Sequence, residues 1–288
     1  MILSSVAQGL LWAILGLGIF TTFRILNFPD MTTEGSFPLG GAVAVTAITH
    51  GFSPFFATLF GVLAGMGAGL ITGLLYTKGK IPTLLSGILM MTACNSIMLF
   101  VMGRANLSLL GQPKLQESLS FINNPSLQAI ILGLIALVLV ISLLFWFFKT
   151  DLGQSYIATG DNKAMAKSFG INTDHMELLG LVLSNGVIAL SGALIAQNDG
   201  YADITKGVGV IVIGLAAIII AEVFFAEVTM FERLITIVIG SIIYQLLILL
   251  VIKAGLNSNY LKMFSAIILA ICLMFPELRK KFLTRGAK

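Results

Sequence analysis

The residues of this chain that could carry out chemistry are few, and none is spaced for catalysis. The sequence has no G-x-x-x-x-G-K-[ST] loop for a nucleotide and no H-E-x-x-H or Ser/His/Asp pattern for hydrolysis. Its two histidines, His50 and His175, fall in separate polar segments that the topology below places at opposite membrane faces. Cys94 and Cys272 lie in apolar runs without paired spacing, so we expect buried thiols rather than a disulfide or a metal site. The sequence therefore predicts a chain that is not an enzyme and that binds no cofactor itself.

A first polar segment, residues 27–41, combines two acidic residues, two prolines and several glycines between short apolar runs. This composition predicts an interrupted helix, and irregular backbone at membrane depth persists only where it is buried in protein or lines a wet cavity. An ordinary turn with solvated charges explains the same residues, and both interpretations stay open. On the first interpretation, polar side chains of this segment line a translocation path together with one amide from a later apolar run. These candidate path residues are Asn27, Asp30, Thr32, Glu34, Ser36 and Asn95.

Other polar side chains lie within or beside the apolar runs. A polar residue in a membrane span usually bonds to a neighbouring helix and only sometimes lines a path. No strongly ionisable residue lies in the middle of a run, since Glu222 is close to an end, and this argues against a proton- or sodium-coupled pump. The polar positions are Thr92, Asn95, Ser96, Asn106, Ser184, Asn185 and Gln245.

The longest polar stretch, residues 149–176, separates two apolar runs. Small or apolar residues alternate with wettable ones over residues 158–169, which predicts a short amphipathic helix. We expect Asp161 to cap the start of this helix and Gly170 to end it. Such a helix is typical of a docking element through which a soluble partner drives a membrane bundle. A connector helix lying at the membrane surface is the alternative.

Composition places the chain in a membrane. It has 288 residues, of which 57% are hydrophobic and 10% charged, and its mean hydropathy is +1.00. A soluble domain carries roughly 25% charged residues. Apolar runs near the ~20 residues that cross a hydrocarbon core predict an all-α bundle of about eight or nine transmembrane helices, with residues 1–288 forming one domain. The runs fall at residues 6–23, 37–50, 54–76, 83–103, 127–148, 177–197, 208–225, 234–252 and 260–275.

Basic residues set the orientation, because cytoplasmic loops carry more Lys and Arg. With the C-terminus in the cytoplasm, twelve of the 17 Lys and Arg residues fall on the cytoplasmic side, and the 149–176 segment lies there too. These membrane-edge residues account for the net charge of +4, which therefore does not indicate a nucleic-acid partner. The second run, at 37–50, is short and rich in glycine, which predicts a broken or partly re-entrant helix.

Two short turns resemble each other. Residues 30–35 read Asp-Met-Thr-Thr-Glu-Gly and residues 203–207 read Asp-Ile-Thr-Lys-Gly, and the two turns face opposite sides in this topology. The echo is consistent with an inverted repeat of the kind found in transporters, although so short a similarity also arises by chance.

Several motifs resemble those of a known family. The loop Gly160-Asp-Asn-x-Ala-x-Ala-x-x-x-Gly-Ile171 is similar to the cytoplasmic loop of bacterial ABC-importer permeases of the branched-chain amino acid and ribose type, and residues 26–42 are similar to an early stretch of that family. The similarity covers nearly the whole chain, although Met165 stands where the family often has a basic or small residue. The resemblance implies that this loop contacts an ATPase. The residues carried over for coupling are Gly160, Asp161, Asn162, Ala164, Ala166, Gly170 and Ile171.

Residues 28–40, 85–92 and 102–110 resemble more narrowly the tryptophan/tyrosine-type amino acid permeases. This resemblance implies a multi-pass protein of the bacterial inner membrane that pairs with a second permease copy, as a homodimer where only one permease type exists. It also implies a separate cytoplasmic ATPase that binds ATP, an extracytoplasmic solute-binding protein, and an amino acid cargo, with the subfamily pointing to an aromatic one. A self-sufficient secondary transporter is the alternative class.

Overall fold

The computed structural model of the chain describes residues 2–119, 124–225 and 228–253 and a few positions between 263 and 270. The described part is almost wholly helical, as predicted, and seven of its helices are long and apolar enough to cross a membrane. The ninth predicted run, at 260–275, lies almost wholly outside the described residues. The spanning helices are α1 (Ile2–Ile19, continued by a π-helical turn, Phe20–Ile25), α3 (Pro54–Thr77), α4 (Thr83–Met102), α5 (Pro125–Lys149), α8 (Thr173–Asp199), α9 (Val210–Phe224, preceded by a 3-10 turn, Ile204–Gly207) and α10 (Met230–Lys253).

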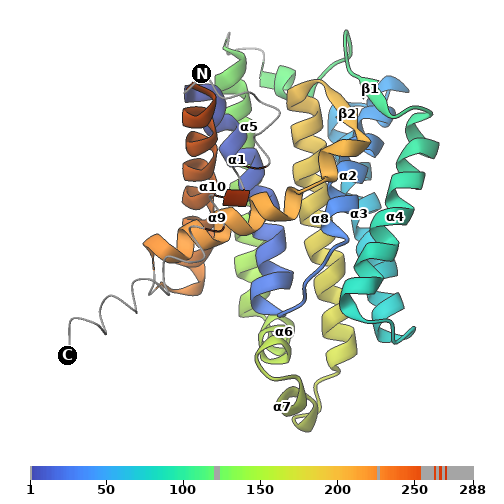
Figure 1. Cartoon of the computed structure of the whole chain (residues 1–288), viewed down its shortest axis with the longest axis vertical. Helices are drawn as coiled ribbons and strands as arrows, with labels where there is room; N and C mark the ends of the chain where they lie inside the picture. Colours follow the sequence, from blue (N-terminus) through green and yellow to red (C-terminus); the bar gives the residue numbers. More distant parts are fainter. Residues whose placement is uncertain are drawn as a thin grey trace.

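Shorter elements complete the two ends of the bundle (Figure 1). A two-stranded antiparallel ladder joins β1 to β2 at one end, and α6 and α7 project from the other. The loop at 78–82 lies at the same end as α6 and α7, because Lys80 forms an ion pair of 3.7 Å with Asp174 in the first turn of α8. The sequence predicted that these loops lie on the same side of the membrane. The shorter elements are α2 (Thr33–Thr49), β1 (Asn106–Ser108), a 3-10 turn (Leu115–Leu119), α6 (Asp151–Asp161), α7 (Lys163–Ser168) and β2 (Tyr201–Asp203).

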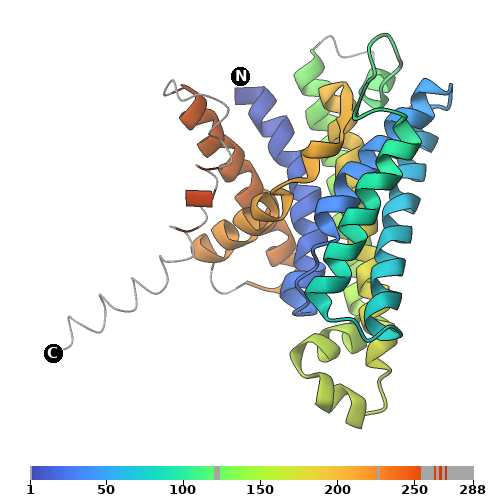
Figure 2. The ribbon, with the colours of Figure 1, turned by 45° about the vertical axis from the view of Figure 1, so that its right-hand side comes forward.

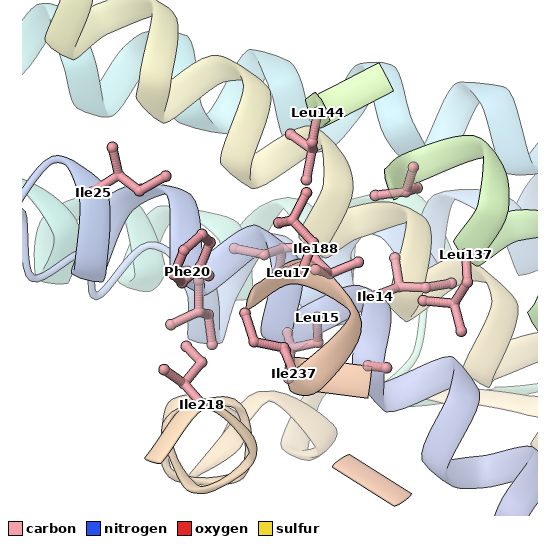
Figure 3. Packing of buried hydrophobic residues seen from close by; sticks show 14 of the residues in the cluster. Ile14, Leu15, Leu17, Phe20, Ile25, Leu137, Leu144, Ile188, Ile218 and Ile237 are labelled. Carbon is pink, nitrogen blue, oxygen red and sulfur yellow. The ribbon is translucent and has the colours of Figure 1, made fainter. Parts of the chain in front are cut away.

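Helices α1 and α8 form the centre of the bundle and are the most buried of the spanning helices. Around α1, aliphatic side chains of α5, α8, α9 and α10 pack into one core, which Figure 3 shows around Leu17 and Phe20. Hydroxyls strengthen the contact with α8, since Ser184 Oγ donates to the carbonyl of Gly18 at 2.9 Å. This confirms for Ser184 the prediction that polar residues in spans join helices.

The helices are arranged as two units of opposite direction. Helix α3 packs on α8 as α10 packs on α1, and the shorter helices α2 and α9 lie against α8 and α1 in the same way. Because α1 and α8 run in opposite directions (Figures 1 and 2), the units α1–α4 and α8–α10 are inverted relative to each other. The similar turns at residues 30–35 and 203–207 therefore occupy corresponding places in the two units.

Helix α2 begins inside the bundle rather than at its surface. After the π-helical turn the chain runs without regular structure over residues 26–32 and returns to the middle of the bundle, where α2 starts (Figure 1). Of the two forms expected for 37–50, the broken helix is not found, because α2 continues through Pro38 without a break. The interruption lies earlier, at 26–32, so the segment is re-entrant at its start.

Glycines of α3 let its backbone pack closely against α8 and, at Gly61, against the carbonyl of Gly40 on α2. A Cβ at Gly65 would clash with Ala189 and with the backbone of Asn185, and a Cβ at Gly69 would clash with the carbonyl of Leu181. In lipid no hydrophobic force draws helices together, so close packing of small residues supplies the attraction. The stripe consists of Gly61, Gly65, Gly69 and Gly73.

Candidate functional site

The projecting element consists of two helices rather than one. Asp161 is the last residue of α6, and Asn162 has extended backbone angles and accepts a hydrogen bond of 3.0 Å from the backbone N–H of Met165. The prediction of one helix over 158–169 capped by Asp161 is therefore wrong, because Asn162 is the cap. The predicted end is confirmed, since Gly170 adopts a left-handed backbone with φ of 82° just after α7.

The residues predicted for coupling fall on different surfaces of this element. Gly160 faces inward, because a Cβ there would overlap the carbonyl of Ile25. Ala166 is fully buried, whereas Ala164 is exposed. Asp161, Asn162 and Gly170 are also exposed, and Ile171 is half-buried.

Two apolar side chains stand out on the exposed surface of the loop. Met165 and Phe169 are four residues apart and are 47% and 74% exposed. An apolar pair at this spacing lies on one side of a helix. The sequence marked Phe169 only as part of an amphipathic pattern.

Helix α6 is fastened to the end of α1 and to the start of the re-entrant segment. Asn27, in a left-handed conformation with φ of 53°, donates from its side-chain amide to the carbonyl of Gly160 at 3.0 Å. The hydroxyl of Tyr156, a buried residue, donates to the carbonyl of Thr21 at 2.6 Å. A displacement of α6 would therefore directly shift residues 21–27.

Helix α7 is fastened by an ion pair that the sequence did not reveal. Lys163 Nζ lies 2.8 Å from both carboxylate oxygens of Glu177, on α8, and 3.2 Å from the hydroxyl of Tyr76, on α3. Burial alone would lower the pKa of Lys163, but hydrogen bonds and charge attraction from Glu177 and Tyr76 outweigh it and raise the pKa above its usual value. The ring of Phe28 meets that of Tyr76 edge-on at 5.1 Å, so the re-entrant segment touches this cluster too.

The re-entrant segment carries a buried polar network. Asp30 is 6% exposed, and its carboxylate accepts from the backbone N–H of Thr32 at 2.9 Å and from the side-chain amide of Asn185 at 2.7 Å. Asn185 in turn accepts from Ser36 Oγ at 2.6 Å, and the hydroxyl of Thr32 lies 2.8 Å from that of Thr72. The structure thus brings Asp30, Thr32 and Ser36 together and adds two partners, Asn185 and Thr72. The signal for Asn185 was an amide in an apolar run, but the sequence did not connect it to Asp30.

The other candidate path residues lie apart from this network. Glu34 points toward α9 and accepts from the backbone N–H of Gly209 at 3.0 Å. Helices α2 and α9 therefore begin next to each other inside the bundle, where their positive N-terminal ends favour a carboxylate. Asn95 is half-buried on α4 and has no hydrogen bond to Asp30 or its partners within the described ranges. Its neighbour Cys94 is a buried free thiol, as predicted, whereas Cys272 lies outside the described residues.

An open cavity of about 990 Å³ lies at the opposite end, beside the β1–β2 ladder. Its walls carry charges of both signs and one apolar side chain, Leu110, that is 93% exposed. None of the candidate path residues lines it. Its lining includes Asn106, Leu110, Lys114, Glu117, Asp199 and Tyr201.

Comparisons with known proteins agree with this architecture. The family described as the permease component of branched-chain amino acid transport systems matches residues 1–274. A tyrosine transport system permease protein of Clostridioides difficile (strain R20291) is 39% identical over 287 residues, which are 100% of this chain and 95% of that protein. The autoinducer 2 import system permease protein LsrC of Yersinia enterocolitica is 27% identical over 187 residues, 64% of this chain and 51% of that protein.

A chain of PsaBC from Streptococcus pneumoniae in complex with Fab shares the fold, with a TM-score of 0.51 and 16% identity over 94% of this chain and 88% of that one. The resemblance drawn from the sequence is thereby confirmed. The chain belongs to the permease family of bacterial branched-chain amino acid ABC transport systems, as a multi-pass protein of the inner membrane.

Proposed function

We propose that this chain is the membrane subunit of an ATP-driven importer that moves an amino acid inward, an aromatic one in view of its tyrosine-permease relative. It forms the translocation path with a second copy of itself, while a separate ATPase binds and hydrolyses ATP. An extracytoplasmic binding protein delivers the cargo to the end that carries the open cavity. No cofactor is assigned to this chain.

The observation that carries this proposal is the attachment of α6 and α7 to the re-entrant segment. The exposed side chains Met165 and Phe169 offer the ATPase an apolar surface at the far end of the element. The inward-facing Gly160 and its bond from Asn27 pass a displacement of that element to residues 25–30. The path assigned to Asn27, Asp30, Thr32, Glu34, Ser36 and Asn95 thus begins where the ATPase acts.

The coupling residues divide into two roles. Ala164 and Gly170 belong with the exposed tip that meets the ATPase, together with Asp161 and Asn162, whereas Ile171 is half-buried and packs against the core. Gly160 and Ala166 instead hold the element to the rest of this chain, because both face inward. Ser36 and Asp30, with their neutral partner Asn185, supply hydrogen-bonding groups but no cation to clamp a carboxylate. Cargo selection therefore rests with the binding protein, and we expect no binding of cargo at micromolar concentration to the permease alone.

Co-purification tests this function. The double variant Met165→Asp/Phe169→Asp should lose the ATPase subunit during purification, because two charges replace the apolar surface. Leu110→Asp is the matched control, since Leu110 is at least as exposed but lies at the opposite end. Retention of the ATPase by the double variant would contradict the proposal. Cargo uptake into vesicles by the permease alone would instead indicate a self-sufficient secondary transporter.

A further inference from the structure

The two corresponding turns of the inverted units share a hydrogen-bonding pattern. One carboxylate oxygen of Asp30 accepts from the backbone N–H of Thr32 at 2.9 Å, and one of Asp203 accepts from that of Thr205 at 2.7 Å. Each turn comes just before a helix that starts inside the bundle, α2 or α9. The aspartate thus fixes the direction in which the chain enters each helix.

The second oxygen of each aspartate is bound by the opposite unit. The side-chain amide of Asn185, on α8, donates to Asp30 at 2.7 Å, and that of Asn106, in β1 after α4, donates to Asp203 at 2.9 Å. The turns themselves need only the first oxygen. The two asparagine bonds therefore serve to join one unit to the other, and each unit holds the turn of its neighbour.

The two bonds lie on opposite sides of the place where α2 meets α9. The Asn106–Asp203 bond joins paired residues of the β1–β2 ladder, beside the open cavity. The Asp30–Asn185 bond is buried at the middle of α8, on the side of α6 and α7. One bond therefore closes the bundle toward the cavity, and the other closes it toward the projecting helices.

We propose that these two asparagine–aspartate bonds are the latches of alternating access, released one at a time as the inverted units rock against each other. The proposal rests on the transport function above. In inverted-repeat transporters one unit moves against the other around a fixed site. A charge-assisted hydrogen bond suits a latch, because it is strong when formed and weakens steeply once its geometry is lost. The structure holds both latches closed. Asn106 is exposed and Asp30 buried, so the latch at the cavity opens more readily.

Thiol labelling of the full chain in membrane vesicles tests the latches separately. The reporter for the Asn106–Asp203 latch is the thiol introduced by Ala202→Cys, since Ala202 is 2% exposed and adjoins Asp203. The reporter for the Asp30–Asn185 latch is the native Cys94, which is buried and packs against Gly35. This reporter is used in a Cys272→Ala background. A membrane-impermeant maleimide is applied from each side in turn.

Each latch variant should expose its own reporter. Asn106→Ala removes a hydrogen bond to a charged group, so labelling at position 202 should rise about tenfold or more while that of Cys94 stays unchanged. Asn185→Ala should accelerate labelling of Cys94 and leave position 202 protected. If Asn185→Ala does not fold, Asp30→Asn serves instead, because it keeps the acceptor for Thr32 and loses the one for Asn185.

Exchanging the two side chains of the latch at the ladder provides the control for a general loosening of the bundle. The double variant Asn106→Asp/Asp203→Asn keeps one amide and one carboxylate across the ladder and an acceptor for Thr205, so it should restore protection at position 202. The proposal is overturned if either single variant exposes both reporters or neither, or if the swap leaves position 202 as reactive as Asn106→Ala does. The measurement involves no ATPase and no cargo. Loss of the proposed transport function would therefore appear in the co-purification test and not here.

Discussion

The ion pair between Lys163 and Glu177 allows a quantitative test of how α7 is held. The Glu177 side chain is 8% exposed and that of Lys163 is 37% exposed. Lys163→Met leaves a buried carboxylate with only the hydroxyl of Tyr76, at 3.4 Å. Removing one partner of a buried pair costs about 3–5 kcal/mol. Because Lys163 is partly solvated, screening reduces the expected loss to about 1–3 kcal/mol.

The reverse substitution should cost less. Glu177→Gln leaves an ammonium group that can turn into water, so we expect a loss of about 1 kcal/mol or less. The double variant Lys163→Met/Glu177→Gln carries no buried charge and should be more stable than Lys163→Met alone. The order of stability is therefore a sharper prediction than any single value.

Hydrogen exchange of the α7 amides, residues 163–168, measures this local opening. A loss of 1–3 kcal/mol corresponds to exchange roughly 5–150-fold faster in Lys163→Met. Amides in the middle of α5, which lie away from the pair, should exchange at unchanged rates. If Glu177→Gln opened α7 as much as Lys163→Met, or if the double variant opened it most, the argument from the buried carboxylate would be wrong.

Three further outcomes follow from contacts described above. Gly69→Leu should abolish a folded permease because its side chain meets the backbone of α8, whereas Gly67→Leu, on the open side of α3, should leave the elution profile in detergent unchanged. Tyr156→Phe should lower the free energy of unfolding by about 1 kcal/mol through loss of its bond to Thr21, as denaturation in detergent would show, and an unchanged midpoint would contradict this. Partial burial alone would raise the pKa of the Asp203 carboxyl, but its hydrogen bonds and a nearby lysine lower it. The ladder should therefore keep this stability above about pH 4 and lose it as pH falls through the lowered pKa, and Asp203→Asn should remove that acid dependence in a pH series of exchange rates.

Most of the bundle could be predicted because the local composition of a segment indicates whether it spans the membrane. Each apolar run within the described residues became a helix, and the projecting loop was found from its polarity. The cap of α7 was misassigned because Asp161 and Asn162 are equally good caps, and only the backbone angles of Asn162 distinguish them.

The partners within the site were harder to predict. The bond between Asp30 and Asn185 joins residues 155 apart in sequence, and it exists only because α2 packs on α8. Lys163 and Glu177 are near in sequence, but the turn at Gly170 that brings them together has no periodic signal. Long-range packing therefore decides which polar residues meet.

The glycine stripe of α3 also bears on how the chain is made. About 100 residues separate the end of α3 from the start of α8, so at ~5–20 residues per second the ribosome delivers α8 about 5–20 s later. Until then the close-fitting face of α3 has no partner in the bilayer and is open to any small-residue helix nearby. The most extensive helix contact of the described structure thus waits until α8 is made, and the nascent permease is prone to mispairing during that interval.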